Sequence, residues 1–84
     1  MIINPNGSIG QAVALYTNCD VLSIDIVQDP VVADVVAIKA DVRPQTGFPA
    51  VPLFFLVRGV PLQKIRAADL EEVEFTAWPP TARL

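Results

Sequence analysis

Alternation of hydrophobic and polar residues, interrupted by proline and glycine, is the feature that most limits how this chain can fold. Leu22, Ile24 and Ile26 alternate with polar residues, and the segments 35–42 and 73–77 repeat the pattern. A period of two residues places every second side chain on one face, as a half-buried β-strand requires. β-branched residues, which strands favour, are frequent in these segments. The pattern predicts a protein built mainly of strands.

Further strands and turns complete the predicted fold. The segment 11–17 indicates a weaker strand, with Val13 and Leu15 on its inner face. Eight prolines and four glycines separate the strands at the spacing expected of an all-β domain. The fold class that follows is all-β: a compact β-sandwich or small barrel of about six short strands. At most one short helical turn is expected, near residues 68–72, where Asp69 resembles a helix cap.

The composition indicates more hydrophobic surface than one small domain can bury. Hydrophobic residues make up 52% of the 84 residues and charged residues only 18%, whereas an ordinary domain has about 25% charged residues. The longest apolar run, Phe48–Val57, is interrupted by prolines, and a membrane span needs about 20 apolar residues. The sequence therefore predicts no membrane partner, and the surplus is expected to contact other proteins.

The surplus is concentrated in one strand and at the two ends of the chain. The strand Leu53–Val57 is apolar on both faces, so either a loop or another subunit is expected to cover its second face. A single domain is expected over residues 11–77, with an N-terminal arm at 1–10 and a proline-rich tail at 78–84. Trp78 either anchors this tail on a neighbour or closes its own domain. The predicted protein-interface residues are Ile2, Ile3, Leu53, Phe54, Phe55, Leu56, Val57, Trp78, Pro79 and Pro80.

Few residues in the chain are suited to catalysis or to metal binding. Histidine is absent and Cys19 is the only cysteine, which removes the commonest general base and any thiolate zinc site. Cys19 is expected to be a buried or half-buried core thiol in a reducing compartment. Six scattered basic residues against nine acidic ones argue against a nucleic-acid partner. We predict a protein that is not an enzyme and has no cofactor, catalytic or metal site.

One part of the chain resembles a known class of structural proteins. An apolar strand at 53–58 is followed by Gly59-Val60-Pro61-Leu62, by Ala68-Asp69-Leu70 and by the alternating segment Val73–Trp78. Residues 51–80 thereby resemble small immunoglobulin-like β-sandwich proteins of tailed-phage virions, such as head-decoration (cement), neck and baseplate components. The resemblance implies a non-enzymatic structural protein in many copies. Its partners would be further copies of itself, a major capsid protein or a tail protein, and its location the virion.

Two alternatives remain open from the sequence. The first is a small monomeric adaptor or inhibitor domain that binds one protein partner, located in the cytoplasm. The second is a redox-inactive thioredoxin-like domain, because Val51-Pro52 before an apolar strand resembles the proline hairpin of that fold. The Cys-x-x-Cys pair of that family is absent, which argues against a redox role.

Overall fold

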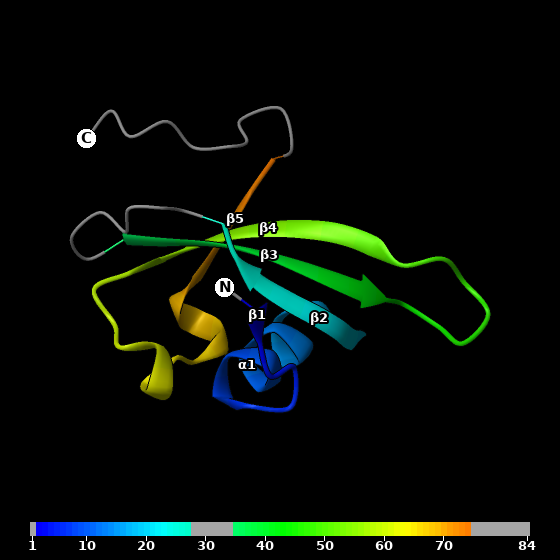
Figure 1. Ribbon diagram of the computed structural model, residues 1–84, viewed down its shortest axis with the longest axis horizontal. Helices are drawn as coiled ribbons and strands as arrows, with labels where there is room; N and C mark the ends of the chain where they lie inside the picture. The colour runs from blue at the N-terminus through cyan, green and yellow to red at the C-terminus, as the bar shows by residue number, and fades with distance from the viewer. Residues whose placement is uncertain (1, 28–34, 75–84) are drawn as a thin grey trace.

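A single antiparallel sheet organises the computed structural model, which describes residues 2–27 and 35–74. Its strands are β1 (Ile2–Ile3), β2 (Asp20–Ile26), β3 (Val35–Arg43), β4 (Val51–Arg58) and β5 (Leu70–Val73). The five strands lie in sequence order, and each neighbouring pair is antiparallel (Figure 1). The prediction that the protein is built mainly of strands is confirmed.

A helix and two short 3-10 turns lie on one face of this sheet (Figure 1). They are α1 (Ser8–Thr17), η1 (Leu62–Lys64) and η2 (Ala67–Asp69). Ile9, Ala12 and Val13 are buried, and their spacing of three and four residues places them on one helical face. At the end of α1, Asn18 adopts a left-handed φ of 55°, and its N–H donates to the carbonyl of Ala14 at 2.8 Å. This hydrogen bond closes the last turn of the helix.

The predicted strand over residues 11–17 is wrong, because this segment belongs to α1. Val13 is fully buried, whereas Leu15, which was assigned to the same inner face, is 77% exposed. Val13 and Leu15 fit a period of two, but Ile9, Ala12 and Val13 fit the helical period over a longer stretch. Alanine, glutamine and leucine also favour a helix. The longer apolar stripe, at helical spacing, favours the helix over the strand.

The hairpin of β3 and β4 forms the centre of the sheet. Ile38 pairs with Phe55 and Ala40 with Leu53, so these side chains share the face that carries α1. The alternation at 35–42 places Val36, Ile38, Ala40 and Val42 on the inner face, and this prediction is confirmed, because all four lie in the core or against it. In β2, a register shift between Val21 and Ser23 makes Val21 pack against the core, and Leu22 is exposed instead. A β-bulge of this kind turns the following side chains over.

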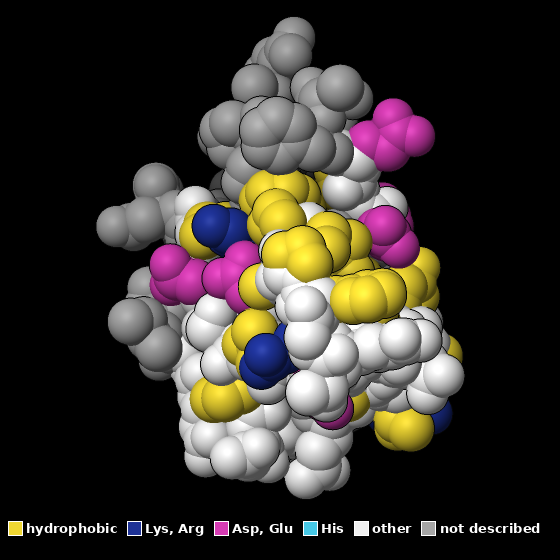
Figure 2. All heavy atoms as spheres, turned by 90° about the vertical axis from the view of Figure 1, so that its right-hand side faces the viewer, with side chains coloured by type: hydrophobic (Ala, Val, Ile, Leu, Met, Phe, Trp, Pro, Cys, Tyr) yellow, Lys and Arg dark blue, Asp and Glu magenta, His cyan; other side chains and the backbone are white. Residues whose placement is uncertain are grey.

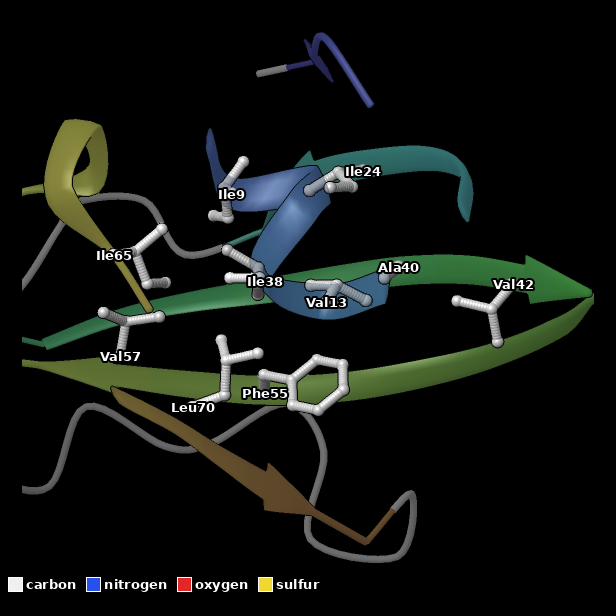
Figure 3. Close-up of a cluster of buried hydrophobic side chains, with 11 residues drawn as sticks. Ile9, Val13, Ile24, Ile38, Ala40, Val42, Phe55, Val57, Ile65 and Leu70 are labelled. Carbon is white, nitrogen blue, oxygen red and sulfur yellow. The ribbon is translucent and has the colours of Figure 1, made fainter. Parts of the chain in front are cut away.

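The hydrophobic core lies between α1 and the sheet (Figure 3). Ile9 and Val13 of the helix face Ile24, Ile38 and Phe55 of the three longest strands. The other labelled core residues are Ala40, Val42, Val57, Ile65 and Leu70. Ile65 follows η1, so the segment after β4 closes one end of the core. Cys19 is half-buried against the same cluster, as predicted.

The predicted β-sandwich or barrel of about six strands is corrected to one open sheet with a helix. Five strands are described, and β1 has only two residues. The chain is not all-β, because the ten-residue helix α1 occupies the place that a second sheet would have in a sandwich. The physical reason is that an amphipathic helix buries one face of a small sheet without exposing further strand edges.

The C-terminal elements differ in detail from the prediction. The helical turn expected near residues 68–72 is η2, where a carboxylate oxygen of Asp69 accepts the backbone N–H of Arg66 at 2.8 Å. Asp69 thus stands at the end of the turn and is not its N-cap residue, but its carboxylate stabilises the start of the turn by accepting the N–H of Arg66. The strand expected at 73–77 begins earlier, as β5. Val73 pairs with Phe54, so it lies on the face away from α1 and not on the inner face. Residues 75–77 lie outside the described residues.

Candidate interaction surface

The apolar strand Leu53–Val57 is buried on both faces within the chain. Leu53, Phe55 and Val57 pack toward the helix, in the core or against it. Phe54 and Leu56 point to the opposite face and are only 6% and 8% exposed. The core of the strand is thus shielded from solvent in the single chain, and only Leu53 at its start is partly accessible.

The other predicted interface residues lie at the two ends of the chain. Ile2 and Ile3 form β1, in register with Asp25 and Ile24 of β2, and Ile3 packs against the core. The segment 1–10, expected as an arm, thereby contributes a strand and the first turn of α1. Trp78, Pro79, Pro80 and the rest of the predicted tail lie outside the described residues.

A different apolar surface is present at the end of the sheet where the β3–β4 hairpin turns. The ring of Tyr16 meets the edge of Phe55, with ring centroids 5.3 Å apart and an angle of 84°. Tyr16 remains partly exposed and Leu15 beside it is almost fully exposed. The helix therefore presents two large hydrophobic side chains to solvent next to β4.

The strand β4 and the hairpin loop continue this surface. Leu53 and Val51 precede Phe55 in β4 at two-residue intervals, so the three side chains lie on the same face. Val51 is exposed. Phe48, in the loop before β4, is 53% exposed. Figure 2 looks onto this end of the molecule and shows hydrophobic side chains gathered at its centre. We define the hairpin-end patch as Leu15, Tyr16, Phe48, Val51 and Leu53.

Acidic side chains border the hairpin-end patch on the side of β5. Glu72 pairs with Phe55 across the sheet, so its side chain lies on the same face as Tyr16, the ring partner of Phe55. Glu72 and Glu74 are both exposed. In Figure 2, acidic side chains flank the hydrophobic group on its right. Within the described residues, the recorded salt bridges join Arg58 to Glu71 and Arg66 to Asp69 and leave these two carboxylates without a basic partner.

A surface pocket of about 660 Å³ lies at the opposite edge of α1. Its lining includes Cys19, Asp20 and Arg43, together with Gln11 of the helix. The Nε of Arg43 is buried and has no hydrogen-bond partner among the described residues. The Sγ of Cys19 donates to the carbonyl of Thr17 at 3.2 Å. The pocket thus holds one thiol, one carboxylate and one guanidinium.

A smaller pocket of about 310 Å³ lies between the start of α1 and η1. It is lined mainly by Ile3, Ile9, Ile26 and Leu62, and the hydroxyl of Ser8 donates to the carbonyl of Leu62 at 3.0 Å. This hydrogen bond ties η1 to the helix, so the pocket belongs to the packing of these two elements.

Metal ligands and membrane-spanning helices are not found in the described part of the chain. Among residues 2–27 and 35–74, histidine, cysteine and acidic side chains form no group of three that could hold a metal ion. No helix in those two segments has the length and hydrophobicity needed to cross a bilayer.

The sequence prediction missed the hairpin-end patch. Leu15 and Val51 lie 36 positions apart in the sequence (51 − 15), and only the packing of α1 on the sheet, where Tyr16 meets Phe55 of β4, brings their elements together. The helical period of residues 9–16 is the signal that would have placed Leu15 on the solvent side.

Comparison of the chain with protein families, with curated proteins and with solved structures finds no match.

Proposed function

We propose that this protein is a non-enzymatic assembly domain that binds another protein through its hairpin-end patch. The observation that carries the proposal is the exposure of Leu15, Tyr16, Phe48 and Val51 at one end of a small sheet. Contiguous exposed hydrophobic surface on a folded domain marks a protein-interaction site. Tyrosine and other aromatic residues are also enriched in the centres of protein interfaces.

A virion component, such as a capsid decoration protein, is the context that we propose for this binding. The support is the local resemblance of the sequence at residues 51–80 to structural proteins of tailed phages, together with the small size of the domain. The fold, one open sheet with a helix, differs from the β-sandwich that this resemblance implied. In such a particle the patch would bury its hydrophobic side chains against a neighbouring subunit. Burial contributes about 25 cal/mol per Å² of apolar surface before the costs of association.

A site-specific cross-linking experiment tests the assembly function. The photoreactive residue p-benzoylphenylalanine replaces Phe48, which it resembles in shape, in cells that naturally make the protein. A second version carries it at Gln63, an exposed position of η1. We expect one discrete adduct from position 48 and none from position 63, because only position 48 lies in the patch. A protein without adducts at position 48 would contradict the proposal.

The fate of the adduct separates a virion component from an adaptor. Sedimentation of the adduct with particles, at a fixed number of copies per particle, supports the virion context. A soluble one-to-one complex supports the second candidate, a monomeric adaptor or inhibitor domain. That candidate has its own observation: in the described part of the chain, the outer edge of β5 has no strand beside it. A free edge of this kind can accept an extended peptide as a further strand.

A further inference from the structure

We infer that the partner of the hairpin-end patch is a cationic amphipathic segment, in which Lys or Arg flanks apolar side chains. This inference rests on the proposed function, because it names the chemistry of the partner that the patch binds. Two halves of the surface carry it: a fixed apolar half on α1, β4 and the hairpin loop, and an acidic half on β5.

The apolar half is held in place by the core beneath it. Tyr16 rests edge-on against Phe55, which is fully buried. Val51 is the neighbour of Val42, which is buried as well. Exposed side chains anchored to core residues in this way lose little conformational freedom when a partner covers them. The patch is therefore preorganised to bind apolar side chains of a partner.

The acidic half has two carboxylates that no Lys or Arg of the described residues neutralises. Glu72 lies across from Phe55, and Glu74 follows two residues later along the same edge. Arg66, the nearest basic residue in sequence, is engaged with Asp69, and Arg58, on the neighbouring strand β4, is engaged with Glu71. A partner segment with a Lys or Arg next to an apolar side chain would contact the acidic half and the apolar half of the surface at once. Charge complementarity of this kind increases the specificity for a partner and the rate of association with it.

A second copy of this chain fits the surface less well. In an isologous dimer the same patch meets itself, so Glu72 and Glu74 of both copies would enter one interface. Each copy also carries a net charge of −3. Like charges brought together in an interface are destabilising. The same acidic border disfavours an anionic membrane surface.

Two synthetic peptides and matched variants test this inference. One peptide places leucine on one face and lysine on the other, and the second has glutamate in place of every lysine. Fluorescence anisotropy measures the binding of each peptide to the full chain at low and at high salt. We expect the leucine–lysine peptide to bind, with an affinity that falls as salt rises, and the leucine–glutamate peptide to bind at least about tenfold more weakly.

The variants assign this binding to the patch. Replacing Leu15 and Phe48 by serine should weaken binding of the leucine–lysine peptide about tenfold. V27S, at the exposed residue directly after β2, should not change it. E72Q with E74Q should weaken it about threefold to fivefold at low salt. The charge control is D20N, on the opposite side of the sheet from β5, and it should have a smaller effect than E72Q alone.

Three results of these solution experiments would overturn the inference, and so would one result of the cross-linking experiment. The first is equal binding of the two peptides, and the second is an equal effect of E72Q and D20N. The third is a dimer in light scattering that the Leu15 and Phe48 replacements dissociate, because the occupant would then be a second copy. A cross-link from position 48 to a partner segment without Lys or Arg would leave the assembly function intact and refute only the cationic partner.

Discussion

At the scale of single residues, Gly10 decides how closely the N-terminal loop approaches helix α1. A Cβ atom built on Gly10 would lie 1.7 Å from the carbonyl oxygen of Pro5 and 2.4 Å from its carbonyl carbon. The loop is held in this position by its own hydrogen bonds, including one from the N–H of Gly7 to the carbonyl of Asn4 at 3.0 Å. Because backbone atoms are close on this side, a side chain has no room.

We therefore expect G10A to destabilise the protein by about 1–3 kcal/mol, as overpacking does. The helix propensity of alanine, worth about 1 kcal/mol, offsets part of this loss. Urea unfolding followed by circular dichroism measures the change. L15A in the same helix is the control, because Leu15 is exposed and should tolerate the change. A G10A protein as stable as the parent would show that the loop can move away without cost.

At the scale of elements, the helix at residues 8–17 predicts opposite effects on stability when Val13 and Leu15, two positions apart, are replaced by alanine. Val13 is fully buried between α1 and the sheet, and Leu15 faces solvent. We expect V13A to lower the free energy of unfolding by about 2 kcal/mol because it leaves a cavity. L15A should change it by less than about 0.5 kcal/mol, as is usual for surface positions.

Chemical denaturation of the two variants measures this difference directly. The parent chain and both variants should show the same far-UV circular dichroism before unfolding. Equal losses for V13A and L15A would fit a strand in which both side chains face inward, and would contradict the helix.

At the scale of the whole molecule, the two faces of β4 determine where a partner can bind. Phe54 was predicted to lie in a protein interface, yet it is buried in the single chain, whereas Phe48 in the hairpin loop is exposed. We expect F54A to destabilise the isolated protein by about 3 kcal/mol. F48A should leave stability nearly unchanged and instead reduce binding of the partner.

Thermal unfolding of the isolated chain and the cross-linking or peptide-binding assay separate these two effects. A stable F54A protein that loses its partner would return the interface to the second face of β4. A strongly destabilised F48A protein would place Phe48 in the core and remove it from the hairpin-end patch.

Local patterns in the sequence determined most of the sheet. The alternation at 21–27 and 35–42 located β2 and β3, because a strand with one buried face needs a hydrophobic residue at every second position. The apolar run Leu53–Val57 located β4. The sequence also located the semi-buried thiol of Cys19, since a lone cysteine behaves as a small hydrophobic side chain.

Only the tertiary structure decided what covers the sheet and which hydrophobic side chains stay exposed. Residues 11–17 fit two periodicities, and the choice of the helix depends on the apolar face of the sheet against which Ile9 and Val13 pack. The hairpin-end patch depends on the same event, because Leu15 and Tyr16 share a surface with β4 only when α1 packs on the sheet and Tyr16 meets Phe55. Local preferences are properties of neighbouring residues, whereas burial is a property of segments that meet only after folding.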